Sequence, residues 1–166
     1  MRDVSDGFRA ALYAQETDEV PICLLTVTHA SLEEPIYISS DPSTRLSDDP
    51  LVYGTESRGQ QYIFLPFEFT FPDDRGDTPP RVQMTMDNIE RTLVSILRTF
   101  FTPPSIKLEI ILASDPDTVE ITMPVLQMSD STIDDHTISI SLVADGLINE
   151  PHPAGQFTPG SFPGLF

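Results

Sequence analysis

Residues that could carry out chemistry are scattered along this chain of 166 residues rather than grouped. The three histidines, His29, His136 and His152, stand far apart and share no ligand spacing such as His-x-x-x-His. No serine lies in a Gly-x-Ser-x-Gly motif, and the sequence contains neither a phosphate-binding loop nor a dinucleotide fingerprint. We therefore expect no enzyme and no cofactor; a hydrolase whose site the sequence does not reveal is kept as an alternative.

Two further motifs resemble binding sites. Asp115, Asp117 and Glu120 carry the oxygen ligands that calcium prefers, but the twelve-residue loop with its central glycine and terminal glutamate is absent. Turn chemistry explains these residues better, so we expect no metal site. The tripeptide at 75–77, Arg-Gly-Asp, is the one that integrins recognise, yet a three-residue match in a polar loop is expected by chance.

The composition restricts the class of protein. Hydrophobic residues make up 39% of the chain, which is enough to bury the core of one domain. There are 26 Asp and Glu residues against nine Lys and Arg, a formal net charge of −17, and such a surface repels nucleic acid at long range. The single cysteine, Cys23, lies in an apolar run and is expected to be a buried thiol. No apolar run approaches the roughly 20 residues needed to span a bilayer, so we expect folding in a cytoplasm and no membrane partner.

Strand patterns dominate the chain. Residues 81–86 alternate, with Val82, Met84 and Met86 on one face, and residues 137–143 place Ile138, Ile140 and Leu142 inward. In the aromatic run at 61–71 both faces are partly apolar, and Pro66 implies an edge or a bulge. The polar segments 41–50 and 72–80 are expected to be loops, and residues 114–118 a hairpin turn. The order of strands and helices predicts an α+β, mostly β domain whose sheets are mostly antiparallel and joined by short connections. The seven expected strands are 20–28, 35–40, 61–71, 81–86, 106–112, 119–128 and 137–143.

Two segments have helical periodicity. Residues 5–16 place Phe8, Ala11 and Leu12 on one face, with Ser5 or Asp6 available as the cap. The second helix, 88–101, is stopped by two prolines and is expected to pack against a sheet as the core helix. Its apolar stripe consists of Ile89, Leu93, Ile96, Leu97 and Phe100.

The last residues form a segment of a different kind. Prolines and glycines disfavour a helix or a central strand there, while large apolar side chains are unusual for a segment that stays in water. We therefore divide the chain into a domain at 1–148 and an extended docking arm at 149–166, which binds its own domain or a neighbouring subunit. The anchors of this assembly arm are Phe157, Phe162, Leu165 and Phe166.

Several stretches, taken together, resemble an uncharacterised-domain family encoded in the tail modules of long-tailed phages and prophages. The resemblance covers nearly the whole chain. The stretches are RAALYAQET at 9–17, SRG at 57–59, LPFEF at 65–69, MDNIER at 86–91, LEIILASDPDTVE at 108–120, NEP at 149–151 and FPGLF at 162–166.

The resemblance implies a virion structural protein of the tail tip, similar in place to a distal tail protein or to the minor tail protein M of phage lambda. Distal tail proteins form rings, typically of six copies, that join the tail tube to the baseplate hub. The core that the resemblance implies is like that of a tube protein, an antiparallel β-sandwich or split barrel with a flanking helix. The expected partners are further copies, the tail tube protein and the hub proteins. The family implies no catalytic residues.

The ring hypothesis gives the acidity a use, because carboxylates lining a channel would keep DNA from sticking as it passes. Candidates for such lumen positions are Asp73, Asp74 and Asp77, together with the pair at 48–49, although each could equally lie on an outer loop. The alternative function is a monomeric binding module for a host-surface carbohydrate. Its face would be formed by Tyr62, Phe64 and the loop at 73–77.

Overall fold

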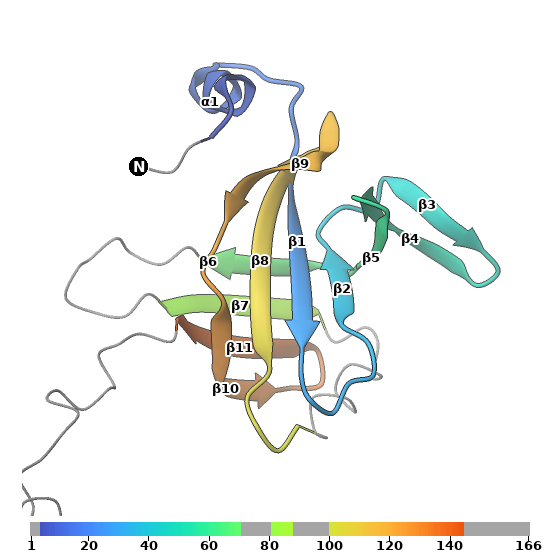
Figure 1. Ribbon diagram of the computed structural model, residues 1–166, viewed down its shortest axis with the longest axis vertical. Helices are drawn as coiled ribbons and strands as arrows, with labels where there is room; N and C mark the ends of the chain where they lie inside the picture. Colours follow the sequence, from blue (N-terminus) through green and yellow to red (C-terminus); the bar gives the residue numbers. More distant parts are fainter. Residues whose placement is uncertain (1–3, 71–80, 88–99, 145–166) are drawn as a thin grey trace, which may run out of the picture.

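A computed structural model of the protein describes residues 4–70, 81–87 and 100–144. The described part contains one short helix and eleven strands, so the predicted α+β, mostly β class is confirmed (Figure 1). The elements are α1 (Asp6–Tyr13), β1 (Pro21–Thr28), β2 (Ile36–Ser39), β3 (Thr44–Asp48), β4 (Leu51–Ser57), β5 (Gln60–Phe64), β6 (Phe67–Thr70), β7 (Arg81–Asp87), β8 (Ser105–Leu112), β9 (Asp115–Thr122), β10 (Leu126–Ile133) and β11 (Thr137–Ala144).

All the strands belong to one mixed sheet, which is not closed into a barrel. Its order is β3-β4-β5-β2-β1-β8-β10-β11-β7-β6, and β9 pairs with β8 beside this path. Every pairing is antiparallel except that of β2 with β5. The sheet folds back on itself into two layers. The first layer contains β1 and β8, and the second layer contains β6, β7 and β11, which cross behind them (Figure 1). Strand β10 joins the two layers because it pairs with both β8 and β11.

The main core lies between these layers. The alternating patterns predicted for residues 81–86 and 137–143 are confirmed, since every second side chain of β7 and β11 is buried. These side chains meet apolar residues of β1 and β8 from the facing layer. Prominent members of this core are Leu25, Leu108, Val82, Met84, Met86, Ile138, Ile140 and Leu142.

Pro66 marks the corner at which the chain leaves the first layer for the second. The aromatic run at 61–71 was expected to be one strand, but it is divided into β5 and β6 by Leu65 and Pro66. The Leu65 amide donates to the Ser39 carbonyl at the end of β2 (3.0 Å), and the Asp87 amide at the end of β7 donates to the Pro66 carbonyl (3.2 Å). The corner is therefore hydrogen-bonded to both layers.

The segment at 41–50 was predicted to be a loop, and this is wrong. It contains β3, which pairs with β4, a strand that the sequence analysis did not anticipate. The two strands form a hairpin that extends away from the body of the molecule (Figure 1). Their side chains are largely polar, so these strands are defined by pairing and not by an apolar pattern: β3 pairs with β4, and β4 pairs with β5. We call β3, β4 and β5 the β-arm.

Two other boundaries differ from the prediction. The expected strand at 119–128 is divided into β9 and β10, and β9 begins at Asp115, inside the segment predicted to be a turn. The hairpin itself is confirmed, because β8 and β9 pair antiparallel and the chain turns at residues 113–114.

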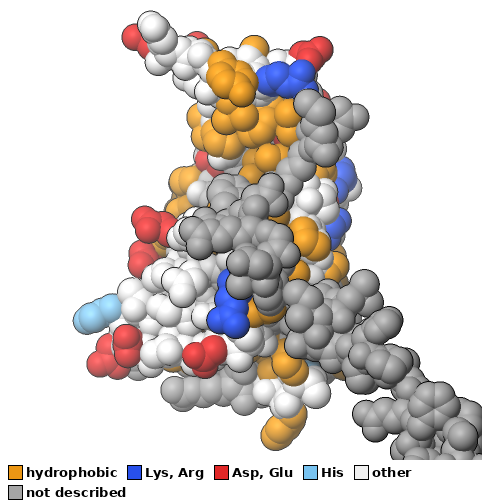
Figure 2. All heavy atoms as spheres, turned by 90° about the vertical axis from the view of Figure 1, so that its left-hand side faces the viewer, with side chains coloured by type: hydrophobic (Ala, Val, Ile, Leu, Met, Phe, Trp, Pro, Cys, Tyr) orange, Lys and Arg blue, Asp and Glu red, His pale blue; other side chains and the backbone are white. Residues whose placement is uncertain are grey.

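Helix α1 confirms the prediction for the start of the chain. Its N-cap is Ser5, whose hydroxyl accepts a hydrogen bond from the Phe8 amide (3.1 Å). Phe8 is buried, but Leu12 from the same predicted face is 64% exposed. Figure 2 shows hydrophobic side chains gathered around α1 at the top of that view. None of the described helices is long and apolar enough to cross a membrane.

Several predicted residues lie outside the described residues. They include most of the core helix, the lumen candidates of the loop at 73–77 and the entire assembly arm, together with the domain boundary at 148/149. The other lumen candidates, the pair at 48–49, are described and lie exposed at the turn between β3 and β4. Phe100 is the one member of the helix stripe within the described part, where it is half-buried and its ring lies 4.3 Å from that of His29. The residues outside are Ile89, Leu93, Ile96, Leu97, Asp73, Asp74, Asp77, Phe157, Phe162, Leu165 and Phe166.

Candidate functional site at the Arg58 turn

The tip of the β-arm extends away from the body, but its other end, the turn between β4 and β5, lies on the outer face of the first layer. This turn fixes the β-arm there. Arg58 and Gly59 form this two-residue turn, and both have positive φ, +51° and +74°. Such turns match the twist of a hairpin, but a left-handed arginine costs on the order of 1 kcal/mol, which an Asn or Gly would avoid. The backbone is held by β9, because the Arg58 amide donates to the Asp117 carboxylate and the Ser57 hydroxyl donates to the Pro116 carbonyl (2.7 Å).

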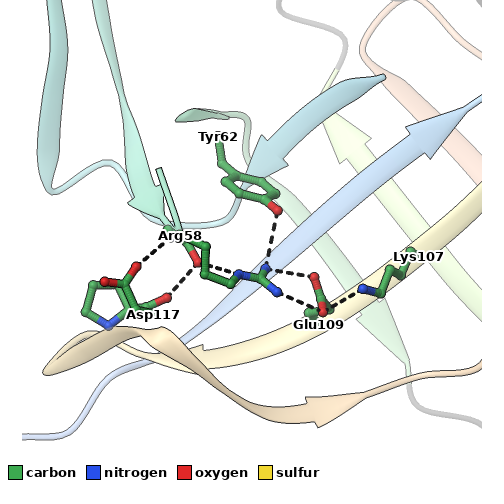
Figure 3. Close-up of polar contacts among 7 residues, drawn as sticks. Arg58, Tyr62, Lys107, Glu109 and Asp117 are labelled. Carbon is green, nitrogen blue, oxygen red and sulfur yellow. Dashed lines mark hydrogen bonds and ion pairs between the residues drawn. The ribbon is translucent and has the colours of Figure 1, made fainter. Parts of the chain in front are cut away.

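The Arg58 side chain points from this turn to a buried carboxylate on β8 (Figure 3). Its Nη2 lies 2.9 Å from Glu109 Oε2 and its Nη1 lies 3.3 Å from Glu109 Oε1, a two-point contact. Lys107 Nζ lies 2.8 Å from the same Oε1. The Glu109 side chain is only 5% exposed, so these cations replace the water that it has lost.

The pKa values follow from this arrangement. Burial by itself raises the pKa of Glu109, but the hydrogen bonds and charges of Arg58 and Lys107 outweigh it and hold the pKa below its ordinary value. The pKa of Arg58 is raised, chiefly by its hydrogen bond to Glu109. Both partners of this ion pair are therefore charged at neutral pH.

A cleft of about 340 Å³ opens between the β-arm and the outer face of the first layer. Thr26, Tyr37 and Lys107 come from the neighbouring strands β1, β2 and β8, where Thr26 pairs with both of the others. Arg58 and Tyr62 come from the β-arm. Tyr37 and Tyr62 meet edge to face, with ring centroids 5.2 Å apart. The cleft thus combines two cations with aromatic surface and one carboxylate that is already paired.

This arrangement can bind and orient an anionic group. Arg58 and Lys107 are charged donors, and Glu109 accepts from both of them with its pKa held below the ordinary value, which makes it a weak proton acceptor. Within residues 4–70, 81–87 and 100–144, no three His, Cys, Asp or Glu side chains come together to hold a metal ion.

The acidic residues that resembled a calcium site are used in two different contacts. Asp117 accepts the hydrogen bond from the Arg58 amide, as described above. Glu120 instead anchors α1, because Ser5 donates to it twice, from its amide (2.8 Å) and from its hydroxyl (2.6 Å). These side chains are structural and do not converge on one point.

The other candidates also have separate positions. His29 accepts from the Ser31 amide at Nδ1 (3.0 Å), so its Nε2 carries the proton and donates to the Thr102 hydroxyl (2.7 Å). His136 lies in the turn between β10 and β11, and His152 lies outside the described residues. Cys23 is buried, as predicted, and burial raises the pKa of its thiol to about 12, which makes it a poor nucleophile.

Arg58, Lys107 and Glu109 were not recognised as a site from the sequence. Two signals were present: an Arg-Gly dipeptide between two strands, and two charged residues spaced by two within the apolar run of β8. That spacing places both charges on one face of a strand. The contact itself joins residues 51 positions apart, and no local pattern encodes it.

The fold and the site define an acidic, mostly β protein with a charged cleft between its β-arm and the first layer. The chain belongs to the family described as domain of unknown function DUF1833, whose model matches residues 7–157. No curated protein matches the chain.

Proposed function

We propose that the chain is a structural protein of the phage virion, a subunit of a tail-tip ring that connects the tail tube to the baseplate hub. The resemblance of nearly the whole chain to tail-module proteins is the starting point of this proposal. The ring consists of copies of the chain, six as is typical of distal tail proteins, and is assembled in the host cytoplasm.

The observation that supports assembly best is the β-arm. It extends from the body of the molecule and exposes large hydrophobic side chains: Leu51 is 57%, Tyr53 42% and Ile63 55% exposed. Helix α1 adds Leu12 and Tyr13, the latter 86% exposed. Apolar side chains on projecting elements are costly for a monomer and are typical of surfaces that a neighbouring subunit covers.

Mass spectrometry of purified virions tests the proposal. We expect the chain in intact particles, at a fixed and low number of copies relative to the tail tube protein. A phage with the coding sequence deleted should produce particles without complete tails, and supplying the chain in trans should restore them. Complete, infectious virions that lack the chain would refute the proposal.

The alternative of a carbohydrate-binding module has weaker support. Its expected face used the ring of Tyr62, but that ring is 4% exposed and packs against Tyr37. Phe64 is half-buried and lines a different hollow of about 460 Å³, next to Pro42 and Phe67. Binding of the purified chain to host-surface glycans on an array, lost on Phe64→Ala, would favour this alternative.

A further inference from the structure

Positive charge is scarce in this protein, and the cleft contains an unusual share of it. The described part has five Lys and Arg residues: Arg9, Arg45, Arg58, Arg81 and Lys107. Arg9 and Arg45 each pair with an aspartate three residues away on the surface. Arg58 and Lys107 lie together in the cleft and share a single carboxylate, that of Glu109.

The cleft can accept one more carboxylate. The Lys107 side chain is 44% exposed, and its ammonium has three donors of which Glu109 uses one. Asp117 is the other acidic group at the turn, but it lies on the opposite side of Arg58 from Lys107 and accepts the Arg58 amide (Figure 3). The excess of positive charge is therefore at the Lys107 end, beside the Tyr37 ring.

The complementary surface is the tip of the β-arm, between β3 and β4. Asp48 and Asp49 are both exposed there; Arg45 pairs with Asp48, which leaves the charge of Asp49 unbalanced. Leu51, which follows Asp49 after Pro50, is exposed and offers apolar surface. The tip and the Arg58 turn are at opposite ends of β4, which at seven residues is roughly 20 Å long, so the tip cannot enter the cleft of its own chain.

We propose that the acidic tip of the β-arm of one copy docks in the cleft of the next copy, where the Asp49 carboxylate meets the Lys107 ammonium. This inference rests on the proposed ring and names the surfaces that join its subunits. Because tip and cleft are different surfaces at opposite ends of one element, the contact is head-to-tail, and such contacts generate rings when the rotation closes. Opposite charges also offset part of the repulsion between copies that each carry −17.

Disulfide cross-linking of the full chain tests this contact directly. Leu51→Cys and Gln60→Cys place one thiol at the tip and one at the rim of the cleft. They leave the Asp49 carboxylate in place, and the native Cys23 is buried. Mixing the two variants under mild oxidation should give a linked dimer. A chain with both changes should give a ladder whose largest closed product reports the ring size. Leu51→Cys mixed with Glu34→Cys, an exposed position on the loop before β2, is the matched control.

A charge cycle provides the second measurement. Asp49→Asn and Lys107→Gln should each weaken self-association, measured by sedimentation at low salt, by about two- to fivefold, and the double variant should lose no more than either single one. Asp18→Asn, which removes an exposed charge in the linker between α1 and β1, should have a smaller effect. High salt should reduce the difference between Asp49→Asn and the original chain.

The outcomes separate this inference from the proposed function. No cross-link above the control, or losses that simply add in the double variant, would overturn the docking of tip into cleft. If the chain is nevertheless present in virions, the tail-tip function stands and the subunits join through other surfaces. Cross-linking of tip to cleft in a chain absent from virions would retain the contact and refute the tail-tip function.

Discussion

Removing the Arg58–Glu109 pair should destabilise the fold by an amount that depends on pH. The perturbation is a double-mutant cycle of Arg58→Asn, Glu109→Gln and the two together. Asparagine is well tolerated at positive φ, so the arginine side chain is removed without adding backbone strain. Glutamine retains the shape of Glu109 but removes its charge.

The magnitude follows from the burial of the two partners. Breaking a fully buried ion pair costs about 3 to 5 kcal/mol, whereas exposed pairs contribute about 0 to 1 kcal/mol. Glu109 is at the buried limit with 5% exposure, but Arg58 is 38% exposed and screened by water. We therefore expect a coupling free energy of about 1 to 2 kcal/mol at neutral pH.

The pH dependence has a definite sign. The pKa of Glu109 is lower in the folded chain than in the unfolded chain, where it has its ordinary value. Such a group stabilises the fold above the unfolded pKa, and the stabilisation is lost as the pH falls through the folded pKa. The coupling should therefore be fully present at pH 7 and decline steadily in acid.

Urea unfolding followed by circular dichroism measures the cycle at neutral pH and again at about pH 2.5, on either side of the sequence pI of about 4.1. Lys107→Gln is the matched comparison, because it removes a cation that is 44% exposed and makes one contact. It should cost less than Arg58→Asn. A coupling below about 0.5 kcal/mol at pH 7, or one that is unchanged in acid, would refute the idea that this pair holds the β-arm.

Three other changes test individual contacts. Ser5→Ala removes the helix cap and one hydrogen bond to β9, so it should lower the free energy of unfolding by about 1 to 2 kcal/mol. Amide exchange should become faster selectively in α1, and a uniform change in exchange would contradict the anchoring role of Ser5. Gly54→Ala places a Cβ 1.9 Å from a carbonyl oxygen of β5, so it should lower the stability measured by thermal unfolding by about 1 to 3 kcal/mol or more. Gly7→Ala is the control, because its Cβ meets nothing closer than 3.8 Å and the change should be neutral or stabilising. Cys23 should react with a thiol reagent only in denaturant, because its pKa is about 12; rapid labelling of the folded chain would show that the thiol is accessible.

The sequence was informative where a strand carries its own apolar pattern. Strands β7 and β11 alternate strictly, and their buried faces were predicted correctly from Met84 and Ile140 and their neighbours. Residue type and position also limited the N-cap to Ser5 or Asp6, and the structure shows Ser5. In these elements, local chemistry and tertiary packing favour the same structure.

The β-arm could not be predicted in this way. Strands β3 and β4 have few apolar residues, and their partners decide their conformation. In β5 both faces were expected to be partly apolar, and the alternation did not tell which of them is buried: Ile63 is 55% exposed, while Tyr62 is 4% exposed. Tyr62 is buried because the β-arm folds over Leu24 and Ile111 of the first layer, a contact between segments distant in sequence.

The corner at Pro66 also determines how the molecule responds to force. Only Leu65 and Pro66 separate β5 from β6, and hydrogen bonds tie this short link to the ends of β2 and β7. A pull on the β-arm therefore passes through the main chain into the second layer, where β6 and β7 resist it as a paired ladder. The link between the β-arm and the second layer is therefore short and hydrogen-bonded rather than a loose hinge. Tension at its tip is distributed over both layers, so mechanical unfolding should require the two layers to separate together.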